Sequence, residues 1–221
     1  MMLILDKPAG LPVHAGPGGG PNLTDHLTAL RFGLPRDPEL AHRLDKDTAG
    51  CLVLGRHRKA LARLADLFKA SAIAKRYWAV VESGPEADEG VIDLAIAPRD
   101  PKRGWWVKVD PKGQAATTRY KVLARGDGRA VLALEPVTGR THQLRVHCQA
   151  LGFPILGDTI YGSAPRFGGP GLHLVARSIS IPFDPKRAPV TAVAPVPAAM
   201  QAAFRAAGLD DLDQSADSPK G

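Results

Sequence analysis

A series of short strand-forming runs, separated by turn residues, most strongly constrains how this chain can fold. Five such runs follow one another after residue 76, with glycine, proline or aspartate between them. They are YWAVVE at 77–82, VIDLAIA at 91–97, WWVKV at 105–109, ATTRYKVLA at 116–124 and AVLALE at 130–135. Runs of this length and spacing are typical of antiparallel hairpins and meanders. We therefore predict a largely antiparallel sheet in this half of the chain.

The first part of the chain adds helices to this pattern. In the stretch 57–70, apolar residues recur at the i, i+3, i+4 and i+7 positions, which predicts an amphipathic helix packed on a sheet. These residues are Leu61, Leu64, Ala65 and Phe68. The strand-like run CLVLG at 51–55 comes directly before this helix, and another helix is expected in 21–33, where Asn22 can cap the first turn. The whole pattern indicates an α+β fold dominated by its sheet.

The C-terminal third continues this architecture and then changes in composition. The segment GRTHQLRVHCQALG at 139–152 predicts a strand end that turns into a helix, with Thr141 as the cap and Gly152 as the stop. A closing strand is expected at 173–182. We assign residues 1–183 to one folded domain. Residues 184–221 form a Pro/Ala-rich tail with room for one short helix and a disordered end.

Several functional classes are disfavoured by composition. The N-terminal apolar run is too short for a signal sequence, and no stretch is long enough to span a bilayer, so we expect a cytoplasmic protein without a membrane partner. Cys51 and Cys148 have no zinc-site spacing, and His142 and His147 are five residues apart, which suits no metal pair. We expect no metal and no cofactor, and a monomer that needs no protein partner.

The charge balance indicates a nucleic-acid partner. The chain carries a net charge of +7, and its isoelectric point is about 9.6. A basic protein of this kind gathers large anions such as RNA. The segment 98–113 mixes cations with two adjacent tryptophans, which suits phosphate binding beside base stacking; its residues are Arg99, Lys102, Arg103, Trp105, Trp106, Lys108 and Lys112. A solvated edge strand protected by lysines explains the same segment equally well.

The stretch AHRLDKDTAG at 41–50 concentrates charge just before a buried strand. Its D-x-D-x-x-G pattern resembles the start of a calcium loop, but the positions that should supply further oxygen ligands are Ala49 and Arg56. Asp45 and Asp47 are therefore not calcium ligands. A solvated turn with internal ion pairs is the simplest alternative for an isolated segment of this type.

Five segments, in this order, resemble the RluA-type pseudouridine synthases. They are KPAGLPVH at 7–14, HRLDKDTAG at 42–50, KRYWAVV at 75–81, KGQAATTRYKVL at 112–123 and TGRTHQLRVHCQALGFPILGD at 138–158. The resemblance implies the pseudouridine synthase fold, a long mixed sheet with flanking helices and a central catalytic cleft that binds RNA. Many members carry an S4-type RNA-binding module ahead of this domain. Here the first matching segment begins at Lys7, so we expect the catalytic domain alone to select the substrate.

The resemblance also implies the site residues. Asp45 corresponds to the family's catalytic aspartate, Tyr77 to its active-site tyrosine, and Arg145 to the arginine expected to keep Asp45 ionised and oriented. Tyr77 is expected to stack on the flipped uracil. His42 and Arg43 are candidates for filling the gap left by the flipped base or for contacting the flanking phosphates, and turn stabilisation is the alternative for both. Arg140 and His142 are candidates for phosphate binding near a helix start.

The expected activity is the isomerisation of uridine to pseudouridine in structured ribosomal or transfer RNA. This reaction needs neither a redox cofactor nor a group donor. Two alternatives use the same features: a non-catalytic RNA-binding protein could use the basic surface, and an N-glycosidase could use the same carboxylate to release uracil. The Asp45, Tyr77 and Arg145 set argues against a pure binder, because such a protein has no need of a carboxylate facing phosphates. Analysis of the product distinguishes the isomerase from the glycosidase.

Overall fold

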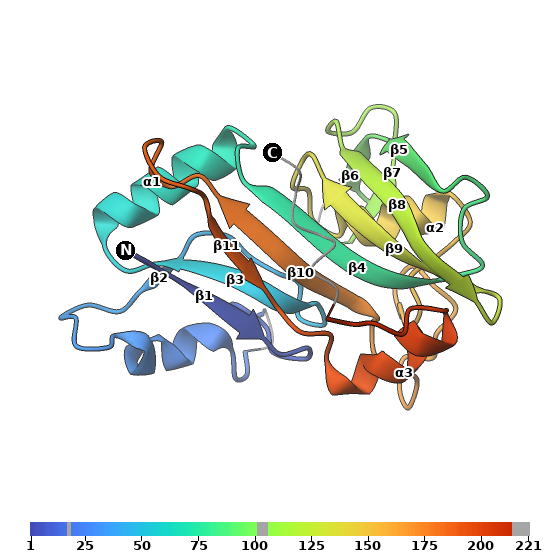
Figure 1. The fold of residues 1–221 in the computed structure, drawn as a ribbon, viewed down its shortest axis with the longest axis horizontal. Coiled ribbons are helices and arrows are strands. Elements are labelled where there is room, and N and C mark those ends of the chain that lie inside the picture. The colour runs from blue at the N-terminus through green and yellow to red at the C-terminus, as the bar shows by residue number, and fades with distance from the viewer. Residues whose placement is uncertain (17–18, 101–105, 214–221) are drawn as a thin grey trace. The chain divides into compact units, whose positions relative to one another are not determined.

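The computed structural model describes residues 1–16, 19–100 and 106–213, and these residues divide into two compact units (Figure 1). The first unit combines Met1–Lys75 with Ala176–Pro195. The second combines Arg76–Val175 with the described residues from Val196 onward. Among the described residues, no helix has both the length and the apolar character needed to cross a membrane.

The first unit is built around strand β3 (Ala49–Gly55), all of whose residues are buried. Strand β1 (Met2–Lys7) pairs with β3 in antiparallel register, as does the short β2 (Glu39–Leu40). Strand β10 (Leu174–Ile181), whose first two residues belong to the second unit, lies next to β3 and has β11 (Val190–Val193) as an antiparallel partner. The remaining element of the N-terminal stretch is the 3-10 helix η1 (Leu23–Leu30).

Both helices of the first unit begin at caps that satisfy free backbone N–H groups. The Asn22 side chain accepts a hydrogen bond from the amide of Thr24, and Asp25 completes a capping box with Asn22. Helix α1 (Arg58–Lys69) begins at His57, whose ring accepts from the amide of Ala60. Its apolar face packs against strands β3 and β10, in a core that includes Val53, Leu64, Leu67, Ile179 and Ile181. The helix was predicted, but Ala65 of the predicted stripe is exposed, and Leu67 is buried instead.

In the second unit, four antiparallel strands stand in the order β4, β9, β8, β5. They are β4 (Ala74–Glu82), whose first two residues belong to the first unit, β9 (Arg129–Pro136), β8 (Thr117–Gly126) and β5 (Glu89–Asp93). A separate hairpin consists of β6 (Ile96–Pro98) and β7 (Val107–Val109). Helix α2 (Gln143–Ala150) packs Leu144 and Cys148 against the core of the four-stranded part.

The predicted α+β class, with a mixed and largely antiparallel sheet, is confirmed, and three local predictions need correction. The run 91–97 is two strands, because the chain leaves β5 at Leu94 and starts β6 at Ile96. Within 105–109, only Val107–Val109 forms a strand, and Trp105 lies outside the described residues. The N-cap of α2 is His142, with φ of 50°, and not Thr141, because the helix begins one residue later than predicted.

The chain beyond residue 183, which the sequence suggested is a tail, contributes to both units. Strand β11 extends the first unit, where Ala194 is buried. Helix α3 (Ala198–Ala206) belongs to the second unit and lies where a short helix was expected. Its Phe204 is 0% exposed, and the ring lies 6.3 Å from that of Trp78 in β4. Both segments bury apolar side chains, which gives them a reason to be ordered.

Candidate active site

The turn that carries Asp45 is short and anchored at both ends. The amide of Thr48 donates to the carbonyl of Asp45 at 3.2 Å. Leu44 and Thr48 are buried, Asp45 is partly buried, and Lys46 and Asp47 between them are exposed. Asp45 therefore lies on a tight turn directly before β3, a strand whose residues are all buried.

Gly50 explains why this turn ends as it does. Its φ is +104°, and a Cβ atom at this position would lie 2.3 Å from the carbonyl oxygen of Ala176. Any side chain would therefore clash with the backbone of the neighbouring strand β10, in addition to the strain of the positive φ. The close contact between the two strands therefore fixes the backbone at the start of β3, directly after the turn.

Lys7, at the end of β1, holds the same turn from inside. Its side chain is 1% exposed, and its ammonium group donates to the carbonyls of Pro8, Leu11 and Lys46 at 2.7, 2.9 and 3.0 Å. The amide of Gly10 donates to the same Lys46 carbonyl at 2.9 Å. Burial lowers the pKa of Lys7 to about 8, while the charges of Asp47 and Asp45 act in the opposite direction.

Lys7 was not among the predicted site residues, although it begins the first matching sequence segment. Its position in KPAG gives no hint of burial, because a lysine at the end of a strand is usually solvated. The attraction between its ammonium group and Asp45 and Asp47 also acts on the carboxylates.

His42 is held by structural contacts. Its Nε2 accepts a hydrogen bond from the amide of Val53 at 3.0 Å, and its ring lies 4.8 Å from that of Phe68. Burial first, and then the charge of Lys75, lower the pKa of His42 to about 4. The ring is therefore neutral at physiological pH, which favours the turn-stabilising role over phosphate binding. Arg43, the next residue, is exposed.

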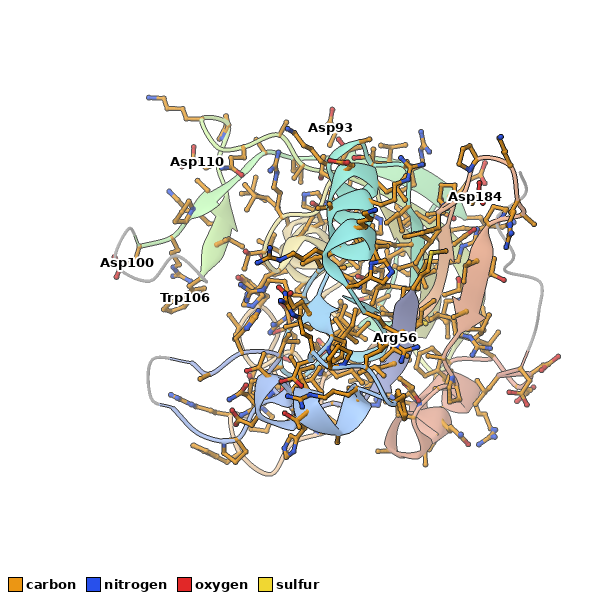
Figure 2. The ribbon with its side chains drawn as sticks, turned by 90° about the vertical axis from the view of Figure 1, so that its left-hand side faces the viewer. Arg56, Asp93, Asp100, Trp106, Asp110 and Asp184 are labelled. Atoms are coloured by element: carbon orange, nitrogen blue, oxygen red, sulfur yellow. The ribbon has the colours of Figure 1, made fainter. Side chains whose placement is uncertain are left out.

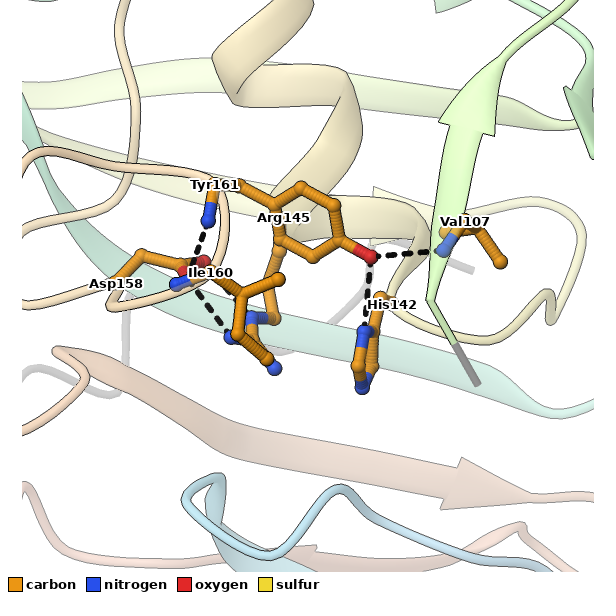
Figure 3. A network of polar contacts seen from close by, with 6 residues as sticks. All are labelled: Val107, His142, Arg145, Asp158, Ile160 and Tyr161. Atoms are coloured by element: carbon orange, nitrogen blue, oxygen red, sulfur yellow. Dashed lines mark hydrogen bonds and ion pairs between the residues drawn. The ribbon is translucent and has the colours of Figure 1, made fainter. Parts of the chain in front are cut away.

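In the second unit, Arg145 forms a buried ion pair that the sequence analysis did not predict. Arg145 is 4% exposed and Asp158 is 1% exposed. The guanidinium donates from Nε to Oδ2 and from Nη2 to Oδ1, both at 2.8 Å (Figure 3). The amides of Ile160 and Tyr161 donate to Oδ1 as well. Burial alone raises the pKa of Asp158, but the hydrogen bonds and charge of Arg145 outweigh it and keep the pKa below its usual value.

Tyr161 lies next to this pair and connects it to two other elements (Figure 3). Its ring centroid is 5.3 Å from Cζ of Arg145, within cation–π range. Its hydroxyl accepts from the amide of Val107 in β7 at 3.1 Å and lies 3.0 Å from Nδ1 of His142. The structure thus brings the predicted residues His142 and Arg145 together around a tyrosine that lies outside the matching segments.

Gln143, the first residue of α2, makes hydrogen bonds to the segment before the helix and to strand β8. The sequence analysis did not predict this residue. Its Oε1 accepts from the amide of Arg140 and the hydroxyl of Thr138, and its Nε2 donates to the carbonyl of Thr117 and the hydroxyl of Thr118. Arg140 itself is exposed and donates from Nε to the carbonyl of Ala115. Position 143 gave no signal beyond its place in the motif.

Tyr77 lies in β4 opposite Leu134 of β9. It is partly buried and packs against the core of the second unit. Asp45 belongs to the first unit, and Tyr77 and Arg145 belong to the second.

The β6–β7 hairpin carries the described part of the basic, aromatic segment. Figure 2 shows Trp106 and Asp110 at the two ends of strand β7. The guanidinium of Arg99 lies 4.5 Å from the centroid of the Trp106 ring. Lys108 pairs with Asp110 at 3.1 Å, and Arg99, Lys108 and Lys112 are all exposed. Lys102, Arg103 and Trp105 lie outside the described residues.

Comparison with solved structures defines the class of this fold. Human RNA pseudouridylate synthase domain containing 4 has a TM-score of 0.78 to this chain at 29% identity, covering 93% of this chain and 89% of the human one. Human RNA pseudouridylate synthase domain containing 1 has a TM-score of 0.72 at 26% identity, covering 88% and 79%. The fold is therefore that of the pseudouridine synthases.

Sequence comparison places the chain within this class. A match to the RNA pseudouridylate synthase family covers residues 1–150, and the chain belongs to this family of isomerases. An uncharacterized RNA pseudouridine synthase of Zymomonas mobilis is 45% identical over 199 residues, which cover 89% of this chain and 90% of that protein. Ribosomal large subunit pseudouridine synthase C of Vibrio cholerae is 36% identical over 184 residues, which cover 80% of this chain but 58% of that longer protein.

Proposed function

We propose that this chain isomerises specific uridines in structured ribosomal or transfer RNA, with Asp45 as the catalytic carboxylate. The observation that carries the proposal is the turn of Asp45, which the buried ammonium group of Lys7 holds through the carbonyl of Lys46. A catalytic carboxylate must keep a fixed direction and stay ionised. The anchored turn supports the first requirement.

The reaction breaks the bond between C1′ and N1 of uridine, turns the uracil and joins its C5 to C1′. The proton on C5 is then lost, and N1 gains one, so no external donor or oxidant is required. An ionised carboxylate can bond to C1′ or stabilise positive charge there, and it can also remove a sugar proton on a route through a glycal. We assign this role to Asp45.

We assign the support of the Asp45 charge to Arg145. Its Nε and one proton of Nη2 already serve Asp158, so this support has to use the remaining donors of the guanidinium. The pair with Asp158 fixes the orientation of the planar guanidinium of Arg145. A lysine ammonium group can rotate freely and would not be oriented in this way. Tyr77, whose ring is partly buried on β4, is our candidate for stacking on the flipped uracil.

The proposed RNA-binding residues follow from exposed charge. Among the predicted residues, Arg43, Arg99, Lys108, Lys112 and Arg140 are exposed and described. Trp106 adds an aromatic ring paired with Arg99, a combination on which an unpaired base can stack. The name of the Vibrio cholerae relative supports ribosomal RNA as the first substrate to test. The cytoplasmic location and the monomeric state stay predictions from the sequence.

Replacing Asp45 by asparagine tests the assignment. The Asp45→Asn variant keeps the shape of the side chain and removes its charge, so we expect pseudouridine formation to fall by at least about a thousandfold while RNA binding persists. The matched control is Asp47→Asn, which makes the same change two residues away on the same turn and should retain most of the activity. Undiminished turnover by Asp45→Asn would show that Asp45 is not the catalytic carboxylate.

The products distinguish the alternative functions. An isomerase leaves uracil attached to the RNA through carbon, an N-glycosidase releases free uracil, and a pure binder changes neither. Digestion of the reacted RNA to nucleosides separates these three outcomes. Pseudouridine mapping in RNA from cells with and without this gene would then identify the target uridine.

A further inference from the structure

Two residues after α2, Asp158 and Tyr161, contact the guanidinium of Arg145. Asp158 takes the edge through two hydrogen bonds of 2.8 Å. The Tyr161 ring covers a face, with its centroid 5.3 Å from Cζ (Figure 3). Because Asp158 is bonded to the amide of Tyr161, the carboxylate also helps to fix the position of the ring. Arg145 therefore depends on Tyr161 as well as on its ion pair.

The Tyr161 hydroxyl has a different set of contacts. It accepts from the amide of Val107, which stands opposite Pro98 in the β6–β7 hairpin. This N–H is directed away from the hairpin partner, so the hydroxyl ties the hairpin to the segment that contains Tyr161. The hydroxyl can give its own proton to Nδ1 of His142 when that ring is protonated on Nε2.

Apolar contacts support the same connection. Val107 and Val146 of α2 are buried in a small core that also contains Ile96 and Ala116, and Tyr161 packs against this core. The hairpin carries Arg99, Trp106 and Lys108, which face solvent at least in part. Tyr161 thus contacts the first residue of β7 in a basic hairpin through its hydroxyl and a buried arginine through its ring.

We infer that Tyr161 is a positioning residue with two separable roles, in which its ring orients Arg145 for turnover and its hydroxyl fixes the β6–β7 hairpin for RNA binding. This inference rests on the proposed function of Arg145. Neither role requires Tyr161 to touch the substrate. The two roles predict different effects on the rate of the bound complex and on RNA affinity, which a purely structural residue would not separate.

Tyr161→Phe tests the hydroxyl. It removes the bonds to Val107 and His142 and keeps the aromatic face over Arg145. We expect the dissociation constant for RNA to rise about three- to tenfold, while the single-turnover rate at saturating enzyme stays within about twofold of wild type. Tyr120→Phe is the matched control, because it removes a hydroxyl from a tyrosine of β8 that packs on the core of the second unit. Unchanged RNA affinity in Tyr161→Phe would overturn the role of the hydroxyl.

The ring is tested by replacing Tyr161 with pentafluorophenylalanine and comparing this protein with Tyr161→Phe. Fluorination keeps the shape and reverses the charge distribution of the ring face, which should repel the guanidinium. We expect the single-turnover rate to fall by about three- to tenfold relative to Tyr161→Phe, with RNA affinity unchanged between the two. Equal rates in the two proteins would overturn the role of the ring.

Arg145→Lys, measured in parallel, separates the two levels of the proposal. If Arg145→Lys turns over bound RNA like wild type, the catalytic role of Arg145 is wrong and the role of the ring falls with it. If Arg145→Lys is strongly impaired but fluorination has no effect, the assignment of Arg145 survives and only the inference about the ring is overturned. Circular dichroism and thermal melting establish in each case that the variant is folded.

Discussion

At the scale of single residues, Lys7 is a buried charged residue whose hydrogen bonds stabilise a turn at the surface. Its ammonium group gives one hydrogen bond to each of three carbonyls, which together satisfy all three of its protons. Burial still disfavours the charged form and lowers the pKa to about 8. The charge persists at neutral pH because its donors are satisfied and two carboxylates attract it.

We expect Lys7→Met to weaken both the fold and the catalysis. Methionine fills similar volume but removes a donor from three carbonyls, of which that of Lys46 keeps the amide of Gly10, so the free energy of unfolding should fall by about 2–3 kcal/mol. The activity should fall further than stability alone explains, because the Asp45 turn loses its inner support. Urea denaturation and single-turnover assays below the transition measure the two effects. The control is Lys46→Met on the exposed part of the turn, and equal behaviour of the two variants would contradict this role for Lys7.

The contacts between the candidate residues could not be predicted from the sequence. Arg145 was identified as a candidate through its motif, but its bond to Asp158 joins residues on a helix and on a later loop. Only the folded backbone between them sets this distance. Tyr161 lies three residues past the last matching segment and gave no signal as a lone tyrosine. Hydrophobic periodicity describes one helix or strand at a time, so it does not predict contacts between residues on different elements.

At the scale of elements, the strongest patterns predicted the structure best. The Leu61, Leu64 and Phe68 periodicity corresponds to α1, and the buried run at 51–55 lies within β3. The weaker signal of β11 was missed because Val190–Val193 is mostly exposed and lies between prolines. Its strand conformation comes from pairing with β10, which is a tertiary effect.

Helix α3 provides a test of whether the C-terminal segment stabilises the fold. Phe204 is 0% exposed and contacts Trp78, so Phe204→Ala should lower the free energy of unfolding by about 3–5 kcal/mol. Arg205→Ala, at the exposed neighbouring position of the same helix, should change it by less than about 0.5 kcal/mol. Chemical denaturation of the two variants gives the comparison. A loss of stability below about 1 kcal/mol for Phe204→Ala would indicate that α3 is dispensable.

At the scale of the whole molecule, the net charge of +7 predicts attraction to RNA but not where the RNA lies. Cations gather in two parts of the sequence, and each is a candidate surface for RNA. One is the β6–β7 hairpin, and the other includes Arg56, Arg58, Lys59, Lys75 and Arg76. Some charges of the second set already have partners: Arg56 donates to the carbonyl of Arg31, and Arg76 pairs with Glu135. Lys108 of the hairpin is likewise paired, with Asp110. The hairpin is the better candidate because Arg99, Lys108 and Lys112 are all exposed, whereas Arg56, Lys75 and Arg76 are partly buried.

Salt dependence of RNA binding tests the hairpin directly. Each phosphate contact releases bound counterions, so log affinity falls with log salt in proportion to the number of contacts. Replacing Arg99, Lys108 and Lys112 together by glutamine should flatten this slope by about two to three units, while the single-turnover rate at saturating enzyme stays near that of wild type.

The control replaces the exposed residues Lys186, Arg187 and Arg205, which lowers the net charge from +7 to +4 in the same way. We expect a smaller change of slope in the control, because loss of net charge weakens long-range attraction without removing a phosphate contact. Equal slopes in the two triple variants would show that the hairpin makes no special contact with RNA, and the second surface would then become the candidate for RNA binding.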